Sequence, residues 1–96
     1  MEFRRMEEKD LEQVVAMEEA TFSMPWSREA FLESMNNPFH VYVVAAEGET
    51  ILGYCGMWGI AGEGQINNVA VREDARGKGI GFAMMEFVLS EGQNKG

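Results

Sequence analysis

The chain has 96 residues, of which 46% are hydrophobic and 25% charged, a composition typical of one small globular domain and unlike a disordered chain. Sixteen acidic and eight basic residues give a net charge of −8, which argues against direct binding of nucleic acid or of anionic membranes. One cysteine excludes an internal disulfide, and no apolar stretch approaches the roughly 20 residues of a membrane span, so we expect a cytoplasmic protein without a membrane partner.

The N-terminal residues predict a short strand followed by a helix. The strand is expected over Phe3–Met6. Apolar residues at helical spacing then predict a helix over Lys9–Thr21. Asp10 and Gln13 have the spacing of a capping box at its start. Glu18 falls on the apolar side of this helix, which indicates either an irregular pattern or an exposed turn.

A second helix and two strands are expected next. Pro25 disfavours helical geometry at the residue before it, and Ser27 is a good N-cap for a helix that ends near Met35. Phe39–Ala46, rich in β-branched and aromatic residues, predicts a strand that returns through a hairpin as a strand over Ile51–Ile60. Glycines within the returning strand predict bulges or close backbone approach.

The C-terminal residues predict one more strand, a loop and a helix. After a turn at Ala61–Gly64, the strand is expected over Gln65–Val71. The polar loop Arg72–Gly79 leads into a helix over Ile80–Ser90, with Gly92 as a plausible stop. The order β-α-α-β-β-β-α predicts a single α/β domain over 1–96, with a mixed sheet. A strand that leads into a helix normally returns as a parallel strand, so we expect later strands and a later helix to follow Gly96 in a larger domain.

The loop before the last helix carries the strongest chemical signal. In Arg76-Gly77-Lys78-Gly79-Ile80-Gly81, alternate glycines permit positive φ, and a helix N-terminus that follows such a loop binds phosphate. Three bases, Arg72, Arg76 and Lys78, lie within it. The pattern fits neither GxxxxGK[ST] nor GxGxxG. It predicts an anion site for a di- or polyphosphate. The alternatives are a plain nucleotide-phosphate binder and a tight strand–helix turn with no ligand.

These residues resemble a known family. Arg76-x-x-Gly79-x-Gly81 matches the (Gln/Arg)-x-x-Gly-x-(Gly/Ala) signature of the GCN5-related N-acetyltransferases (GNAT), and Ile66–Val71 resembles the fourth strand of that fold. Phe22-Ser23-Met24-Pro25-Trp26-Ser27 and Gly53–Trp58 are similar to segments of the ribosomal-protein-alanine N-acetyltransferases, the RimI type.

The resemblance implies the N-terminal part of the acyl-CoA N-acyltransferase fold and direct transfer of an acetyl group from acetyl-CoA to a protein N-terminus. The acceptor would be an N-terminal alanine, such as that of a small-subunit ribosomal protein. The resemblance assigns the cofactor to Val69, Ala70, Val71, Arg76, Gly77, Lys78, Gly79, Ile80 and Gly81. It assigns the acceptor to Phe22, Pro25 and Trp26, although Trp26 and Phe31 could instead simply fasten the second helix to the sheet.

The catalytic residues are not identified by the sequence. Some family members place a carboxylate base at the position of Gln65, where glutamine cannot take up a proton. The subgroup resembles enzymes whose glutamate and tyrosine would follow Gly96, and within the chain Glu63 is a weak candidate whose alternative role is that of a solvated turn residue. No Cys/His cluster has metal-ligand spacing, and Cys55 is expected in the core.

A second function remains open. The chain could be a catalytically inactive member of the family that binds CoA or self-associates. In that case the open edge of the strand Gln65–Val71 would be expected to form a homodimer.

Overall fold

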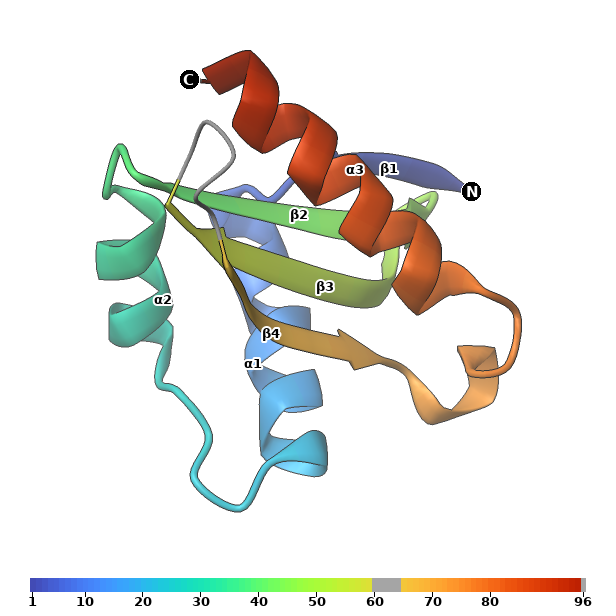
Figure 1. The fold of residues 1–96 in the computed structure, drawn as a ribbon. Coiled ribbons are helices and arrows are strands. Elements are labelled where there is room, and N and C mark those ends of the chain that lie inside the picture. Colours follow the sequence, from blue (N-terminus) through green and yellow to red (C-terminus); the bar gives the residue numbers. More distant parts are fainter. Residues whose placement is uncertain (60–64, 96) are drawn as a thin grey trace.

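The computed structural model describes residues 1–59 and 65–95. It confirms the predicted order of elements and adds two short 3-10 turns, η1 and η2 (Figure 1). The expected turn Ala61–Gly64 lies outside the described residues. The elements are β1 Glu2–Arg5, η1 Glu8–Asp10, α1 Leu11–Thr21, α2 Arg28–Met35, β2 His40–Glu47, β3 Thr50–Trp58, β4 Gln65–Val71, η2 Glu73–Ala75 and α3 Ile80–Lys95.

The described strands form one antiparallel sheet in the order β1-β2-β3-β4. β2 and β3 make the predicted hairpin, in which Gly48 has a φ of 61°. The β3–β4 register shifts between Gly56 and Met57, so the bulge expected from the glycines of β3 is present. Within the described residues β4 has a neighbour on one side only, which leaves its other side free for a ligand or another strand.

Helices cover both faces of the sheet. In Figure 1, α3 crosses in front of β2 and β3, whereas α1 lies behind the sheet. Residues of α1 and α2 share the core on that opposite face. The inward residues of β2 therefore alternate between two cores: Tyr42 and Val44 pack with α1 and α2, and Val41 and Val43 pack with α3. Because both faces are buried, β2 is apolar at nearly every position instead of alternating with polar residues.

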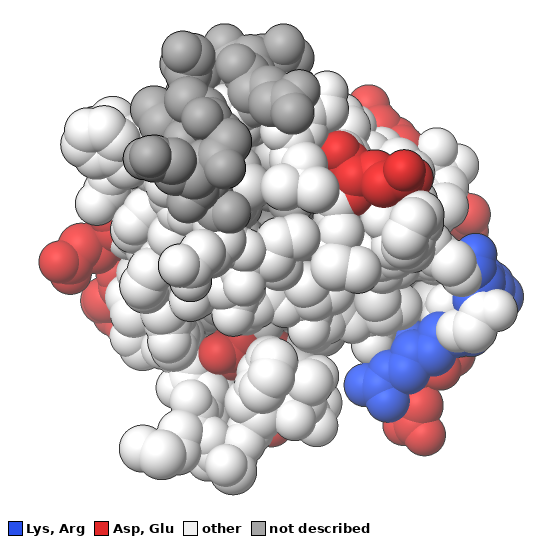
Figure 2. Space-filling view, in the orientation of Figure 1, with Lys and Arg blue, Asp and Glu red and all other residues white. Residues whose placement is uncertain are grey.

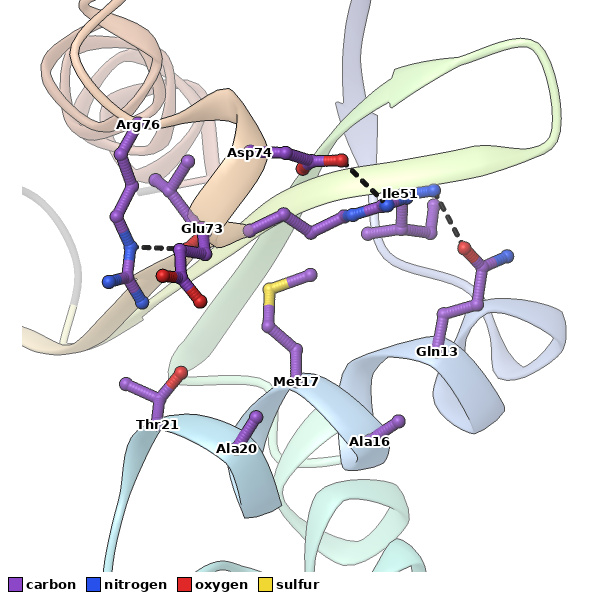
Figure 3. Close-up of a pocket in the computed structure, with 11 residues that line it drawn as sticks. Gln13, Ala16, Met17, Ala20, Thr21, Ile51, Glu73, Asp74 and Arg76 are labelled. Carbon is purple, nitrogen blue, oxygen red and sulfur yellow. Dashed lines mark hydrogen bonds and ion pairs between the residues drawn. The ribbon is translucent and has the colours of Figure 1, made fainter.

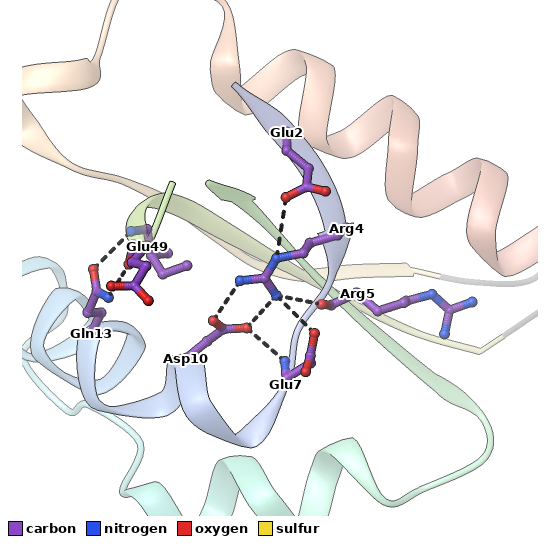
Figure 4. A network of polar contacts seen from close by, with 8 residues as sticks. Glu2, Arg4, Arg5, Glu7, Asp10, Gln13 and Glu49 are labelled. Atoms are coloured by element: carbon purple, nitrogen blue, oxygen red, sulfur yellow. Dashed lines mark hydrogen bonds and ion pairs between the residues drawn. The ribbon is translucent and has the colours of Figure 1, made fainter. Parts of the chain in front are cut away.

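An ion pair fixes the start of α1 (Figure 4). Both carboxylate oxygens of Asp10 accept from the Arg4 guanidinium at 2.8 Å, and the Glu7 N–H donates to the same carboxylate at 2.8 Å. The predicted capping box of Asp10 and Gln13 is wrong, because Asp10 closes a capping box with Glu7 one turn earlier. Gln13 instead fastens α1 to the hairpin, since its amide donates to the Glu49 carbonyl and accepts from the Ile51 N–H.

The start of α2 is set by a local hydrogen bond, and the end of α3 is set by packing against a distant residue. Ser27 caps α2 as predicted, with its Oγ accepting from the Ala30 N–H at 3.1 Å. The predicted stop at Gly92 is wrong, because α3 continues through it to Lys95. Gly92 is buried, and a side chain there would collide with the thioether end of Met57, so this glycine permits close packing of α3 on β3. Among the described residues no helix is both long and apolar enough to cross a membrane.

Candidate functional site

The free edge of β4 presents backbone groups in a regular order. The Arg72 N–H donates to the Leu52 carbonyl of β3 at 2.8 Å. Because successive strand residues direct their backbone groups to opposite sides, those of Val71 and Val69 face away from β3. The backbone of Ala70 faces β3, and its side chain is buried on the α1–α2 face. Val69 can therefore offer its N–H and C=O groups, and Val71 its N–H group, to a ligand that lies along this edge.

The loop that follows β4 has the backbone that its glycines predict. Its first turn, η2, is anchored by the buried side chain of Ala75. Gly77 and Gly79 then have φ values of 82° and 77°, a left-handed region that costs an L-residue about 1–2 kcal/mol. A Cβ at either position would meet no atom within 4 Å, so glycine is required here by backbone conformation and not by crowding. Gly81 lies in α3, where a Cβ would make ordinary contacts with Val71.

The start of α3 faces this loop. The Ala83 N–H donates to the Gly79 carbonyl at 3.1 Å, so the N–H groups of residues 80–82 precede the helix bonds and point toward the loop. The bases Arg76 and Lys78, both exposed, belong to the same loop. On the face seen in Figure 2, blue side chains, with red ones beside them, lie over the η2 and α3-start region of Figure 1. This end of an acidic protein therefore has the features of an anion site.

A pocket of about 850 Å³ opens between α1 and the end of β4 (Figure 3). Met17 and Ala20 project into it from α1, and Arg76 projects from the loop on the opposite side. The Arg76 Nε donates to the Val71 carbonyl at 3.0 Å, and Arg72 pairs with Asp74 at 3.0 Å. One side of the pocket is therefore apolar and comes from α1. The other side is polar and includes Val71 and Arg76, two of the predicted cofactor residues.

A second pocket, of about 340 Å³, lies between the α1–α2 connection and β4. Two of the predicted acceptor residues, Phe22 and Trp26, line this pocket, and Pro25 does not. The full lining is Glu18, Phe22, Ser23, Met24, Trp26, Asn67 and Asn68. We refer to it below as the Glu18 pocket. The fold therefore brings the α1–α2 connection to the same strand, β4, that leads into the glycine loop.

Trp26 also has the packing role that was the alternative to a site. Its ring lies 5.3 Å from that of Phe31 and 5.9 Å from that of Trp58, measured between centroids. Phe31 is fully buried and meets Tyr54 edge to face at 5.8 Å. Trp26 is half-buried, so one ring both fastens α2 to the sheet and forms part of the pocket wall.

The prediction for Glu18 from the sequence pattern was wrong. The residue is buried, with 4% of its surface exposed, and is neither an irregularity nor part of an exposed turn. Its carboxylate accepts from the Tyr54 hydroxyl and, at 3.0 Å, from the Trp26 N–H. Burial raises the pKa of the Tyr54 hydroxyl, and the Glu18 carboxylate raises it further. A single acidic residue on an otherwise apolar helix face was the available signal, and only the fold supplies its partners.

The remaining residues considered for catalysis or metal binding lie in different surroundings. Glu63 lies outside the described residues. Gln65 is exposed at the start of β4. Cys55 is fully buried in the core beneath α3, and burial raises the pKa of its thiol to about 12, so it is a core residue as expected. Among residues 1–59 and 65–95 no group of three or more potential metal ligands was found.

Comparison with known proteins gives consistent matches. The family model described as "Acetyltransferase (GNAT) family" matches residues 11–96. A Bacillus subtilis protein provisionally named ribosomal protein bS18-alanine N-acetyltransferase is 33% identical over 87 residues, which cover 90% of this chain and 58% of that protein. The chain therefore spans less than two thirds of the length of this relative.

Solved structures share the fold at lower identity. The ribosomal-protein-S18-alanine N-acetyltransferase of Escherichia coli matches with a TM-score of 0.79 at 20% identity, over 94% of this chain and 57% of that one. The PaiA N-acetyltransferase of Thermoplasma acidophilum, solved in complex with coenzyme A, matches with a TM-score of 0.77 at 16% identity, over 94% and 72% of the two chains. At these identities the likeness concerns the fold alone.

Proposed function

The chain belongs to the acetyltransferase (GNAT) family, and from this membership we propose that it binds acetyl-CoA for direct transfer of the acetyl group to the α-amine of a protein N-terminus. The proposed acceptor class is an alanine-starting ribosomal protein, which is the substrate class in the names of the B. subtilis and E. coli relatives. Acetyl-CoA supplies the activated thioester carbonyl, and the chain supplies the surfaces that hold it and the acceptor.

The observation that carries the proposal is the continuous polar path from the β4 edge to the start of α3. The outward N–H and C=O groups of Val69 and the N–H group of Val71 suit the amide groups of a pantetheine arm. The left-handed backbone at Gly77 and Gly79 and the N–H groups at the start of α3 suit a pyrophosphate. The Thermoplasma structure is described as a complex with coenzyme A, which supports this choice of ligand.

The acceptor is proposed to approach from the α1–α2 connection. Phe22 and Trp26 line the Glu18 pocket, which also touches β4 at Asn67 and Asn68. An amine in this pocket would lie beside the strand whose edge is proposed to hold the thioester. Such proximity is a large part of what an acyl-transfer site must provide.

A second function, a CoA-binding or self-associating module without turnover, rests on the free side of β4. Within the described residues this strand has one neighbour, and an open strand edge can pair with a second copy. Sedimentation velocity separates the two possibilities. A folded protein that stays monomeric across the concentration range contradicts self-association, and acetylation of an alanine-starting peptide, detected by mass, contradicts an inactive module.

Calorimetry with acetyl-CoA tests the cofactor proposal directly, and one matched pair of variants tests the loop. Gly79→Ala and Gly48→Ala both force an L-residue into a left-handed backbone, at φ values of 77° and 61°, and neither Cβ meets an atom within 4 Å. Both should therefore lose about 1–2 kcal/mol of stability. Only Gly79→Ala should also weaken acetyl-CoA binding, by about tenfold or more.

The control decides how a loss is interpreted. Equal weakening by Gly48→Ala, which lies in the β2–β3 hairpin, would mean that general destabilisation and not loop geometry causes the effect. A folded sample that binds no acetyl-CoA at millimolar concentration would contradict the cofactor proposal itself.

A further inference from the structure

The Glu18 pocket holds a buried carboxylate that packing does not explain. Its other lining residues carry no charge, and Glu18 retains only 4% of its exposure. We propose that Glu18 is the residue that binds the α-ammonium of the acceptor, a role that deepens the proposed function and rests on it.

Burial of this carboxylate is costly. Moving a charged group from water into an apolar core costs free energy that hydrogen bonds offset only in part. Glu18 lies on the face of α1 that packs with Val14 and Met17, where an apolar residue would meet no such cost. The apolar contacts of α1 therefore give no reason for a carboxylate here, and its partners within the protein are the Tyr54 hydroxyl and the Trp26 N–H.

Two hydrogen bonds orient the Glu18 carboxylate but leave some of its acceptor sites unoccupied. Tyr54 donates to one carboxylate oxygen and the Trp26 N–H donates to the other. A carboxylate oxygen has two acceptor sites, so each oxygen keeps one after these bonds. Tyr54 comes from β3 and Trp26 from the α1–α2 connection, so three separate parts of the chain orient the carboxylate at the pocket.

A second acceptor is buried beside the pocket. Within the described residues, the buried Oδ1 of Asn68 has no hydrogen-bond partner, and Asn68 lines the pocket from β4. A Cβ at Gly56 would lie 2.6 Å from this oxygen, so the glycine makes room for the amide. An ammonium has three N–H donors, and the remaining acceptor sites of Glu18 and the Oδ1 of Asn68 are of the kind it needs.

The pocket walls favour a small, positively charged terminus. Phe22 and Trp26 contribute aromatic surface, and aromatic faces attract cations. An N-acetylated terminus has neither the charge nor the three donors. The pocket should therefore discriminate between the substrate amine and the acetylated product.

An NMR titration that follows individual backbone amides tests whether the pocket prefers a free amine. Two compounds that differ only in the amine are compared, alaninamide and N-acetylalaninamide, at about pH 6.5, where an α-amine is protonated. The backbone N–H of Trp26 is the reporter, because it is bonded to Glu18. We expect alaninamide to shift this signal with at least about tenfold higher affinity than N-acetylalaninamide, the value of one charge-assisted hydrogen bond.

Two variants test whether Glu18 causes the preference for alaninamide. Glu18→Gln keeps the shape and removes the charge, and it should reduce the preference for alaninamide to less than about twofold. Glu19→Gln, on the exposed side of the same helix, makes the same charge change and should leave the preference intact. Equal affinity of the wild-type protein for the two compounds, or a preference that survives in Glu18→Gln, overturns the proposal. The wild-type comparison decides alone if Glu18→Gln does not fold.

Failure of this inference is separable from failure of the proposed function. Acetyl-CoA affinity, measured on the same samples, should be the same in the wild type and in Glu18→Gln. A normal acetyl-CoA affinity without amine preference refutes the role of Glu18 alone, whereas absence of acetyl-CoA binding refutes the proposed function.

Discussion

Replacing Asp10 by asparagine removes the charge that ties the start of α1 to β1. Asp10 is 3% exposed. Its carboxylate accepts two bonds from Arg4 and one from the Glu7 N–H, all at 2.8 Å. An asparagine of the same shape keeps one acceptor oxygen and turns an NH₂ group toward the donors of Arg4 or Glu7, so at least one of these bonds is lost.

The cost follows from the number of bonds and from their exposure. A hydrogen bond to a charged group is worth about 1.5–3 kcal/mol, and breaking a fully buried ion pair costs about 3–5 kcal/mol. The Arg4 side chain keeps 20% of its exposure and has a second carboxylate, Glu7, at 3.6 Å, so the loss should fall at or below the lower end of the range for a fully buried pair. We expect Asp10→Asn to lose about 2–3 kcal/mol at pH 7, which lowers the Tm by about 10–20 °C in a domain of this size.

Urea unfolding followed by far-UV circular dichroism measures this loss. The matched control is Asp74→Asn, which removes a carboxylate from an Arg72 pair at 3.0 Å, but one in which the two side chains are 42% and 68% exposed. Exposed pairs contribute about 0–1 kcal/mol, so the control should stay within about 0.5 kcal/mol of the wild type. If the two variants lose equal stability, burial does not determine the strength of the Asp10 pair, and the reasoning fails.

The same pair makes stability depend on pH in a defined direction. Burial acts to raise the pKa of Asp10, but the hydrogen bonds from Arg4 and the Glu7 N–H hold it below its ordinary value. A carboxyl whose folded pKa is depressed stabilises the fold above its unfolded pKa of about 3.9, and that contribution is lost as the pH falls through the folded pKa. The stability difference between the wild type and Asp10→Asn should therefore be full at pH 7 and should narrow below about pH 4.

Two further predictions concern a core cysteine and a helix cap. Because burial raises the pKa of the Cys55 thiol to about 12, Cys55 should react with a disulfide reagent at about pH 8 only after urea unfolding; rapid reaction of the folded protein would contradict its place in the core. Ser27→Ala removes the bond to the Ala30 N–H and should cost about 1 kcal/mol, whereas Ser23→Ala, outside both helices, should cost less; equal losses would argue against the cap.

Local signals in the sequence were enough for the elements that lead to the site. The strand Gln65–Val71 was predicted with the bounds that the structure gives. The start of α3 was equally clear, because left-handed glycines and a polar loop interrupt two apolar segments there. The cap at Ser27 depends on a bond to a residue three positions away, so the sequence alone contains the necessary information.

Predictions failed where a residue had several possible partners nearby, as at Asp10, or a partner distant in the sequence, as at Gly92 and Glu18. Asp10 was expected to cap α1 with Gln13, but Arg4 and the Glu7 N–H engage its carboxylate instead. Gly92 resembled a helix stop because nothing in its neighbourhood shows that Met57 packs against it. Glu18 interrupted an apolar pattern, and its role became visible only when β3 brought Tyr54 to it.

The two cores on opposite faces of the sheet differ in their optical properties. The chain has two tryptophans and two tyrosines, and Trp26, Trp58, Tyr42 and Tyr54 all belong to the contacts on the α1–α2 face. The buried core beneath α3 contains no tryptophan or tyrosine. Intrinsic fluorescence therefore reports on the face that holds the Glu18 pocket, whereas helix circular dichroism also includes the long α3. Comparing the two signals during unfolding would reveal whether both layers melt as one cooperative unit.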